Sequence, residues 1–305
     1  MIRLNNLTKK YKNKTAVNNL NITFTPGVVT GFLGPNGSGK STTMKMIISL
    51  VHPTLGDISV DDNDYKSYKN PTKKIGTLID PATIDVDLTA KQHLYFFSIA
   101  ANISQKRIYE VLKMTGLESV KDNKVKTYSL GMKQRLGIAT ALINDPDVVI
   151  LDEPFNGLDV DGIHWIRRLL KKLSSEGKTV IVSSHLMGEI QAVADRVIII
   201  ARGKLLANMS IDELNEKTLT TYSYVEAENL EEMEKVLKLN GGNTIRRLEG
   251  LEVRGLDSRI IGSLASENHQ ILYQLKDVQP TLEEFFIDIT EGKVDYISEL
   301  NEIFD

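Results

Sequence analysis

The segment from Gly34 to Ser41, Gly-Pro-Asn-Gly-Ser-Gly-Lys-Ser, constrains the fold of this chain more than any other. It has the spacing G-x-x-x-x-G-K-[ST] and lies between an apolar strand, Val28–Leu33, and a helical pattern, Thr42–Leu50. Glycines allow consecutive backbone N–H groups to turn inward around phosphate oxygens, and the following helix directs its positive dipole end at the same anion. The segment therefore predicts an α/β fold with a phosphate-binding loop at the end of a strand.

The side chains of this loop have separate expected roles. The Lys40 ammonium would reach the β- and γ-phosphates of a nucleotide, and the Ser41 hydroxyl would ligate Mg²⁺. A Gly-rich turn that only happens to contain Lys-Ser is the alternative, which the strand and the helix on either side disfavour. We therefore expect ATP and Mg²⁺ to bind here, with contacts from Gly34, Pro35, Asn36, Gly37, Ser38, Gly39, Lys40, Ser41 and Thr42.

A second pattern lies at Asp152 and Glu153, which follow the apolar run Val148–Leu151. Neighbouring residues on a strand point to opposite faces, so two adjacent carboxylates can serve different partners. Asp152 would hold Mg²⁺, while Glu153 would polarise the water that attacks the γ-phosphate. Two acids at a strand end are commonly just solvated, but their occurrence with the phosphate loop favours the catalytic interpretation.

Strand and helix patterns alternate over the first two thirds of the chain. Short apolar runs separated by longer helical patterns occur at Val28–Leu33, Val148–Leu151, Thr179–Ser183 and Arg196–Ile200. This alternation predicts a mostly parallel sheet covered by helices. Residues 86–141 show apolar residues at helical spacing and no convincing strand. We therefore expect residues 1–214 to form one α/β domain with a helical insertion at about 86–141.

The pattern changes after Leu214. Short strands and helices then follow in the order β-α-β-β-α-β between Tyr222 and Leu275. This order predicts that residues 215–305 form a small α+β accessory domain, with ferredoxin-like topology. We expect the boundary between the two domains within the polar stretch Asn208–Thr221.

Charge is distributed unevenly along the chain, whose net charge is −3. Residues 215–305 hold 19 acidic and 9 basic side chains, whereas residues 1–214 hold 21 acidic and 28 basic ones. A mildly positive first part suits a polyphosphate ligand, and an acidic second part disfavours nucleic acid as a partner. A solvated acidic face is the simpler explanation of the acidic excess.

Composition also limits the class of protein and its location. The chain has no cysteine, which excludes thiol chemistry and a disulfide framework. No apolar run approaches the roughly 18 residues that span a hydrocarbon core, and the N-terminus lacks the features of a secretory signal. We therefore expect a cytoplasmic protein that does not cross a membrane by itself.

Ser129 occupies the N-cap position of a helical pattern that starts Leu-Gly-Met-Lys-Gln-Arg. A serine and backbone N–H groups at a helix start also form an anion site. Together with the phosphate loop and Leu-Asp-Glu-Pro, this helix start precedes Gly157-Leu-Asp159 and Ser183-Ser-His185. These motifs stand in the order found in ABC transporter ATPases, which residues 1–210 resemble.

The resemblance implies functions for several of these residues. In that family, the residues at Ser129 and Gly131 bind the γ-phosphate of ATP held by the opposite subunit, so two nucleotides lie between head-to-tail subunits. It also implies that Tyr11 stacks on adenine, that Asp159 contacts the other subunit, and that His185 senses the γ-phosphate and positions water. An aromatic ring can stack on a base, and His can both donate and accept. From residue type alone, packing for Tyr11 and capping for His185 stay open.

Asp80 departs from the family pattern. Most members have Gln here, in a loop that touches both Mg²⁺ and the membrane partner. An acid at this position resembles the subgroup that handles bacitracin and lantibiotics, in which Glu commonly replaces the Gln. The run from Ser129 to Ala139 and the C-terminal extension are similar to that subgroup too. Capping of the turn before Pro81 is the alternative for Asp80.

The resemblance implies the ATPase subunit of a bacterial ABC exporter for antimicrobial peptides. Such a subunit forms a homodimer on ATP binding and drives a separate integral membrane permease from the inner face of the cell membrane. A soluble ABC ATPase that acts on ribosomes or nucleic acid is one alternative, which the single cassette and the acidic tail disfavour. A regulatory nucleotide-binding switch is the other, which Glu153 and His185 disfavour.

Overall fold

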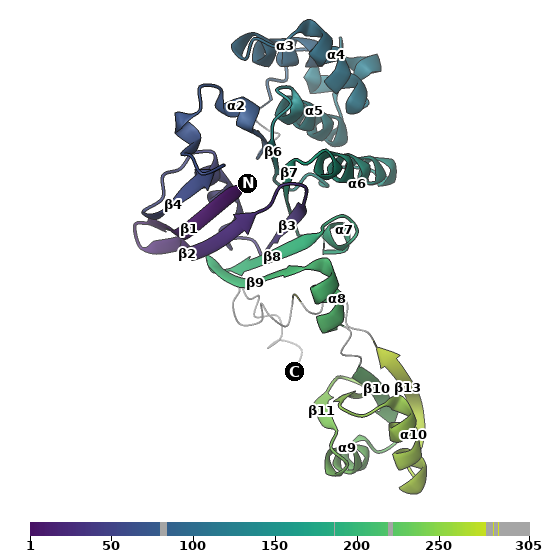
Figure 1. Cartoon of the computed structure of the whole chain (residues 1–305). Helices are drawn as coiled ribbons and strands as arrows, with labels where there is room; N and C mark the ends of the chain where they lie inside the picture. The colour runs from purple at the N-terminus through teal and green to yellow at the C-terminus, as the bar shows by residue number, and fades with distance from the viewer. Residues whose placement is uncertain (80–83, 186, 219–221, 279–282, 284–285, 287–305) are drawn as a thin grey trace. The chain divides into compact units, whose positions relative to one another are not determined.

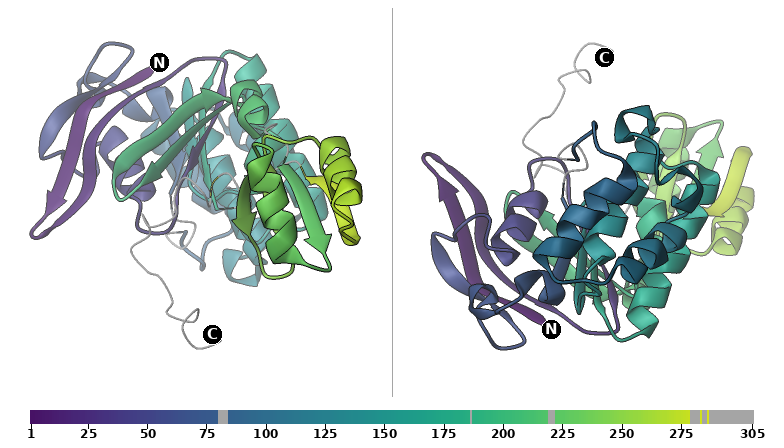
Figure 2. Two further views of the ribbon diagram at one scale, coloured as in Figure 1. Left: turned by 90° about the horizontal axis from the view of Figure 1, so that it is seen from below. Right: turned by 90° about the horizontal axis from the view of Figure 1, so that it is seen from above.

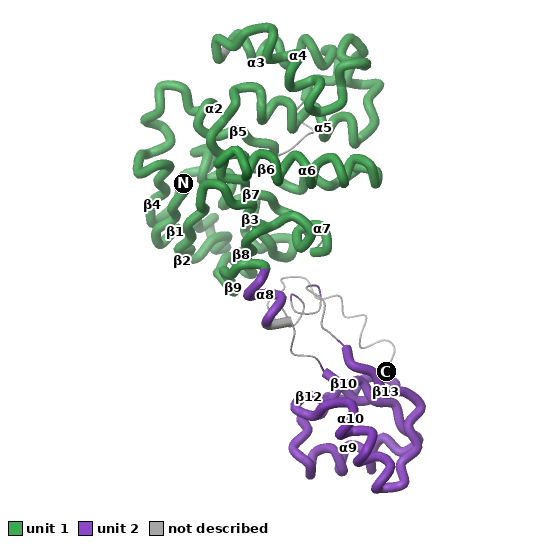
Figure 3. The backbone as a smooth tube through the Cα atoms, turned by 45° about the vertical axis from the view of Figure 1, so that its right-hand side comes forward, with its two compact units in different colours: residues 1–211, 290–305 green, residues 212–289 purple. Residues whose placement is uncertain are grey.

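The computed structural model describes residues 1–305 except 80–83, 186, 219–221, 279–282, 284–285 and 287–305. The chain divides into two compact units, Met1–Ile211 and Asp212–Ile289 (Figure 3). Their boundary lies within the polar stretch Asn208–Thr221. That stretch is not a loop, because the end of β9 (Lys204–Ser210) and α8 (Ile211–Thr218) occupy most of it.

A six-stranded sheet forms the centre of the first unit, in the order β5-β6-β7-β3-β8-β9 (Figure 1). Neighbouring strands are parallel except β9, which is antiparallel to β8. Every residue of β3, β6 and β7 is buried, as in sheets covered on both faces by helices. The predicted mostly parallel sheet is confirmed, and its strands are β3 (Val29–Leu33), β5 (Ile75–Leu78), β6 (Val148–Leu151), β7 (Thr179–Ser184), β8 (Arg196–Ala201) and β9.

Helices pack on this sheet and form the predicted insertion, in which no strand occurs between residues 86 and 141. The insertion starts at Thr89, whose side chain and that of Gln92 form a reciprocal capping box. No helix within the described residues has the length and hydropathy needed to cross a membrane. The helices of this unit are α1 (Lys40–Ile47), α2 (Pro71–Lys74), α3 (Ala90–Ala100), α4 (Gln105–Met114), α5 (Leu130–Leu142), α6 (Val160–Ser175) and α7 (Met187–Gln191).

A second, antiparallel sheet of the first unit has the order β2-β1-β4. It comprises β1 (Ile2–Tyr11), β2 (Lys14–Phe24) and β4 (Leu55–Val60). Its apolar residues share one core with α1 and the six-stranded sheet, and the ring of Phe24 meets that of Phe32 edge to face. Two views show this sheet on one side of the first unit and helices α3 and α4 on another (Figure 2).

The second unit has its own core, made by a four-stranded antiparallel sheet and two helices. The sheet has the order β11-β12-β10-β13, which is the β-α-β-β-α-β arrangement of ferredoxin-like folds. The prediction of a small α+β fold in this part of the chain is confirmed. The elements are β10 (Tyr222–Ala227), α9 (Leu230–Leu239), β11 (Asn243–Arg246), β12 (Leu251–Arg254), α10 (Ser258–Glu267) and β13 (Leu272–Val278).

Candidate nucleotide site

Three adjacent parallel strands, β6, β7 and β3, bring the predicted catalytic residues to one edge of the six-stranded sheet. The phosphate loop follows β3, Asp152 and Glu153 follow β6, and His185 directly follows β7. Parallel strands end on the same side of a sheet, where ligands of α/β proteins bind. Residues more than a hundred positions apart along the chain therefore meet at this edge.

The phosphate loop packs so closely on its surroundings that two of its glycines have no room for a side chain. A Cβ built on Gly34 would lie 2.3 Å from the Ile200 carbonyl oxygen. One built on Gly39 would lie 2.4 Å from the Ala16 carbonyl oxygen, and Gly39 has a φ of +105°, which favours glycine. The close packing at these two glycines holds the loop in place directly before the first turn of α1.

A cavity of about 320 Å³ lies over this loop. Asn36 to Thr42 line it, together with Ala16, Asp152 and Glu153. The hydroxyl of Ser38 is buried and has no hydrogen-bond partner among the described residues. An unpartnered buried hydroxyl is unfavourable, so a phosphate oxygen in this cavity would satisfy an existing donor. The lining residues therefore fit a phosphate group.

Lys40 is the buried cation of the site. Its Nζ donates to the carbonyl oxygens of Gly34 at 2.5 Å and Pro35 at 3.3 Å. Burial lowers the pKa of this ammonium below its ordinary value of 10.5, while the carboxylates of Glu153 and Asp152 act in the opposite direction. A nucleotide phosphate would add negative charge beside Lys40 and so favour its charged form.

Ser41 and Asp152 offer oxygen ligands for a cation. The Ser41 hydroxyl donates to Oδ2 of Asp152 at 2.7 Å, and the hydroxyl of Ser183 donates to Oδ1 of the same carboxylate. Hydroxyl and carboxylate oxygens suit Mg²⁺, a hard cation that usually keeps waters and substrate phosphates in its shell. In the described part of the chain, no three acidic or histidine side chains gather at one point. Mg²⁺ held by this pair would therefore complete its shell with phosphate and water oxygens.

Glu153 occupies an unusual backbone conformation beside the cavity. Its φ is +50°, in the left-handed region that few non-glycine residues adopt. Its N–H donates to the Ser183 hydroxyl at 2.9 Å, and its carbonyl oxygen accepts from Nε2 of Gln134 at 3.0 Å. Oε2 of Glu153 lies 2.8 Å from Nδ1 of His185. Backbone and side-chain contacts therefore fix the direction of this carboxylate.

Ser129, Gly131 and Asp159 lie at the starts of two helices, outside the residues that line the cavity. Ser129 Oγ accepts from the N–H of Met132 at 3.2 Å, and Asp159 Oδ1 accepts from the N–H of Gly162 at 2.8 Å. A Cβ on Gly131 would lie 2.7 Å from the carbonyl oxygen of Gly157. The two helix starts are therefore in direct contact with each other.

Tyr11 lies at the end of β1, with 46% of its surface exposed and Lys9 Nζ 4.9 Å from the centre of its ring. It belongs to the same hairpin as Ala16, which lines the cavity. Tyr11 itself is not among the lining residues. Asp80 lies outside the described residues.

Comparison with known proteins identifies the family. Residues 17–156 match the family model described as ABC transporter. The uncharacterized ABC transporter ATP-binding protein YhcH of Bacillus subtilis (strain 168) is 36% identical over 296 residues, which cover 95% of this chain and 96% of that protein. The chain belongs to the ABC transporter ATP-binding proteins. The predicted family, fold class and ATPase activity are confirmed.

Two further proteins resemble this ABC ATPase closely. The bacitracin transport ATP-binding protein BcrA of Enterococcus faecalis is 33% identical over 299 residues, which cover 96% of this chain and 97% of that protein. The dimeric ATP-binding cassette MJ0796, in a post-hydrolysis state bound to ADP and Pi, is 30% identical with a TM-score of 0.64. The similarity to that structure covers 69% of this chain and 99% of the cassette.

Sequence reasoning missed two residues that position Glu153 in this ABC ATPase. Ser183 contacts both the Asp152 carboxylate and the Glu153 N–H, and Gln134 supports the Glu153 carbonyl. The position of Ser183 follows from strand register, which the structure shows and the sequence alone does not give. Leu151 pairs with Val182 in adjacent parallel strands, so the residues that follow each of them are also neighbours.

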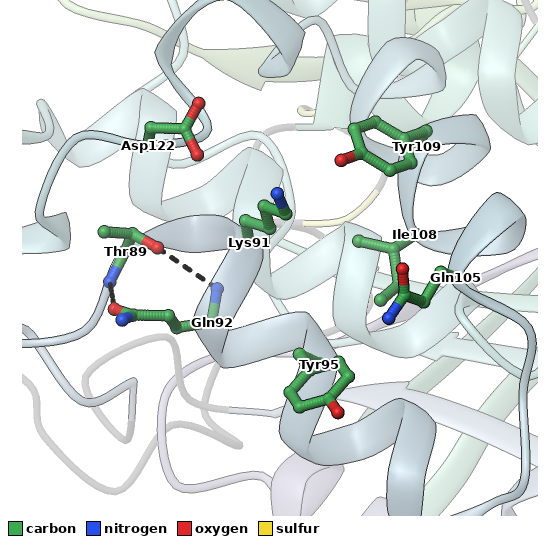
Figure 4. Close-up of a pocket in the computed structure, with 8 residues that line it drawn as sticks. All are labelled: Thr89, Lys91, Gln92, Tyr95, Gln105, Ile108, Tyr109 and Asp122. Carbon is green, nitrogen blue, oxygen red and sulfur yellow. Dashed lines mark hydrogen bonds between the residues drawn. The ribbon is translucent and has the colours of Figure 1, made fainter.

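A second cavity, of about 420 Å³, lies between α3 and α4 of the insertion (Figure 4). Tyr95 and Tyr109 form part of its wall, and Lys91 Nζ lies 5.5 Å from the centre of the Tyr109 ring. Asp122 adds a negative charge to the same lining. No residue of the phosphate loop lines this cavity, whereas Asn36 to Thr42 line the smaller cavity.

Proposed function

We propose that this ABC ATPase drives the export of peptide antibiotics through a separate membrane permease. The hydrolytic part of the proposal rests above all on one observation, the hydrogen bond between Glu153 and His185 beside a cavity that Lys40 and Asp152 also line. This arrangement combines a cation for phosphate, an acidic metal ligand and a base for water. A nucleotide-binding switch that does not hydrolyse ATP needs no base for water.

Hydrolysis requires a water molecule aimed in line at the γ-phosphate. Glu153 would accept the proton of that water, and His185, which bonds to Glu153 through Nδ1, would face the γ-phosphate with its other ring nitrogen. The backbone N–H groups from Gly37 to Ser41 and the Lys40 ammonium would bind the phosphates. Ser41 and Asp152, together with Asp80, would hold Mg²⁺, which neutralises phosphate charge when bound. Tyr11 would stack on adenine.

A second copy of the chain would complete each nucleotide site. Leu130 and Val160, next to Ser129 and Asp159, have 58% and 71% of their surface exposed, which is unusual for apolar residues at the starts of two adjacent helices. Burial against a partner subunit would remove this exposure. Ser129 and Gly131 would then contact the nucleotide of the other subunit, and Asp159 would contact the subunit itself.

An apolar groove of the first unit would receive a helix of the permease. This groove has a volume of about 390 Å³, and its lining includes Leu50, Leu78 and Phe97. Leu50 and Phe97 have 70% and 44% of their surface exposed, and the neighbouring Phe96 has 59%. Leu78 lies two positions before Asp80 in the sequence. Docking here would connect the permease directly to the nucleotide site, and would place the protein on the inner face of the cell membrane.

Cargo is assigned through the nearly full-length similarity to a bacitracin transport ATP-binding protein. The similarity extends through the C-terminal unit, which a cassette alone does not possess. We therefore assign a peptide antibiotic of the bacitracin type as the cargo.

Survival of bacteria in bacitracin tests this proposal. Cells that produce the chain with its cognate permease should grow at higher bacitracin concentrations than cells that produce the permease with E153Q. If both strains grow equally while the parent protein releases phosphate from ATP, the assignment of the cargo is wrong. The assignment of ATPase activity would then still hold.

A further inference from the structure

Three helices of the first unit meet at Trp165, the only tryptophan of the chain. Nε1 of Trp165, on α6, donates to the carbonyl oxygen of Met114 at the end of α4 at 2.9 Å. The Arg135 guanidinium, on α5, stacks over the Trp165 ring with Cζ 4.3 Å from the ring centre. Arg135 Nη1 also donates to the Thr115 carbonyl oxygen at 3.1 Å.

These contacts supply hydrogen-bond donors to carbonyl groups at the C-terminal end of α4. The last carbonyl groups of a helix lack partners within it, and they carry the negative end of the helix dipole. Here the indole N–H and the cationic guanidinium supply the donors for Met114 and Thr115, respectively. A flat guanidinium can stack on an indole and still donate in its own plane, which a lysine ammonium cannot do.

The same contacts give α5 and α6 a second point of attachment to each other. The first point is the approach of Gly131 to Gly157 at the starts of the two helices. The second is the stack of Arg135 on Trp165, further along both helices. Each helix also packs on the central sheet, α5 against β5 and α6 against β7, and the stack adds a second direct link between the two helices.

The residues next to this stack belong to the nucleotide machinery. Gln134, adjacent to Arg135, donates to the carbonyl oxygen of Glu153. Ser129 is the N-cap of α5, and Asp159 is the N-cap of α6. A change in the angle between α5 and α6 would therefore move Ser129 and Asp159 relative to each other and to the catalytic carboxylate.

We propose that Trp165 and Arg135 are positioning residues that hold Ser129 and Asp159 in the one arrangement that a second, ATP-bound copy of the chain can engage. This inference rests on the proposed function, since it concerns the same subunit contact. Without the stack, the free subunit samples several helix orientations. Association of two subunits must then select one of these orientations, and this loss of conformational entropy lowers the affinity between subunits. The affinity of each subunit for ATP is unchanged.

Association of subunits in the E153Q background, which should bind ATP without hydrolysing it, tests the proposal. W165F keeps an aromatic ring but removes the N–H donor, and R135K keeps the charge but removes the stack. Each should weaken ATP-driven dimerisation about fivefold, the equivalent of one lost hydrogen bond, and leave ATP binding to the monomer unchanged. The matched control is R168K, at an exposed arginine of the same helix, which should change neither quantity.

A double-mutant cycle with S129A separates positioning from general stability. If Trp165 acts through Ser129, W165F should weaken dimerisation less than twofold once Ser129 is already alanine, because coupled residues are not additive. Additive losses would overturn the positioning role and indicate only a structural one. Unchanged dimerisation of both W165F and R135K would overturn it as well.

Fluorescence of Trp165 supplies an independent readout that does not depend on the W165F variant. ATP-driven association should change the emission less in E153Q than in E153Q with R135K, whose indole is no longer held by the guanidinium. Equal changes in the two proteins would contradict the proposal. Failure of E153Q itself to dimerise with ATP would instead overturn the proposed subunit contact, and the positioning role with it.

Discussion

Nδ1 of His185 and Oε2 of Glu153 lie 2.8 Å apart, although the two residues are 32 positions apart in the sequence and follow different strands. The Glu153 backbone is left-handed at this point, with a φ of +50°. Such a conformation costs of the order of 1 kcal/mol and persists where surrounding contacts determine it. Hydrogen bonds from Glu153 to Ser183 and from Gln134 to Glu153 are those contacts.

Replacement of Glu153 by Gln should stop turnover without emptying the site. The amide keeps the size of the side chain but cannot accept a proton from water, so the rate of phosphate release should fall by about 10²- to 10⁴-fold. ATP affinity, measured by calorimetry, should stay within about twofold of the parent protein. E176Q, at the exposed end of α6, is the control. Near-normal phosphate release by E153Q would assign the base to another residue.

Replacement of Lys40 by Ala should abolish productive nucleotide binding. The variant loses the buried ammonium of the phosphate loop, and two charged hydrogen bonds to phosphate account for about a hundredfold in affinity. K45A removes an exposed lysine from the same helix and should bind ATP normally. Binding of ATP to K40A with parental affinity, measured by calorimetry, would exclude the assigned phosphate site.

Replacement of Gly131 by Ala should weaken the contact between subunits and leave ATP binding to the free subunit unchanged. The new methyl group would lie 2.7 Å from the Gly157 carbonyl oxygen and force the two helix starts apart. We expect ATP-driven dimerisation to weaken about tenfold in the E153Q background, a typical cost of overpacking. G188A is the matched control, because a Cβ there meets nothing within 4 Å. Equal dimerisation of the two variants, by size-exclusion chromatography, would contradict the role of Gly131.

Acid should destabilise the first unit through His93. Burial lowers the pKa of its imidazole below the ordinary value of 6.5, while Asp85 acts in the opposite direction. Between the folded-state pKa and 6.5 the unfolded chain binds more protons, so the stabilisation is present above pH 6.5 and is lost as the pH falls below it. Nε2 of His93 lies 3.0 Å from the Thr140 hydroxyl, a contact that the neutral amide of H93Q can preserve. Urea unfolding at pH 7.5 and 5.5 should show a smaller difference for H93Q than for the parent; equal differences would exclude His93.

A substitution in the core of the second unit should lower the stability of that unit without changing nucleotide binding. The Glu252 carboxylate has 1% of its surface exposed and pairs with Arg254 at 2.7 Å and Arg247 at 2.5 Å. E252A should destabilise this unit by about 1–2 kcal/mol, because hydrogen bonds to two arginines are lost while the arginines, which are about half exposed, can be hydrated. Its ATP affinity should equal that of the parent. Hydrogen exchange would locate the change, and weakened ATP binding would contradict the independence of the two cores.

Local sequence patterns predicted the parallel sheet well, because each buried strand is a short apolar run. They did not predict the antiparallel sheet at the N-terminus. Its strands β1 and β2 are interrupted by register shifts, and Asn6 and Asn19 adopt left-handed backbones with φ of 48° and 55°. Such interruptions break the two-residue alternation on which strand prediction depends. β4 is mostly exposed or half-buried, so it too lacks an apolar signal.

Sequence patterns named the site residues that lie together in one motif. They did not name the residues that position these side chains from other strands and helices. The whole spacing of the phosphate-loop motif lies within consecutive residues, so roles could be predicted for Lys40 and Ser41 from the sequence alone. Ser183 and Gln134 act on Glu153 from a neighbouring strand and from the insertion. Their function depends on strand order and helix packing, which local patterns do not contain. The stack of Arg135 on Trp165 has the same origin.

The buried hydroxyl of Ser38 would link occupancy of the phosphate loop to the stability of the folded chain. A buried hydroxyl without a partner costs about 1–3 kcal/mol, and a bound phosphate would remove that cost. A ligand that binds only the native chain raises the free energy of unfolding by about 2.7 kcal/mol at a hundred times its dissociation constant. ATP bound at the loop would therefore stabilise the folded chain, and the chain without nucleotide would unfold and be cleaved by proteases more readily.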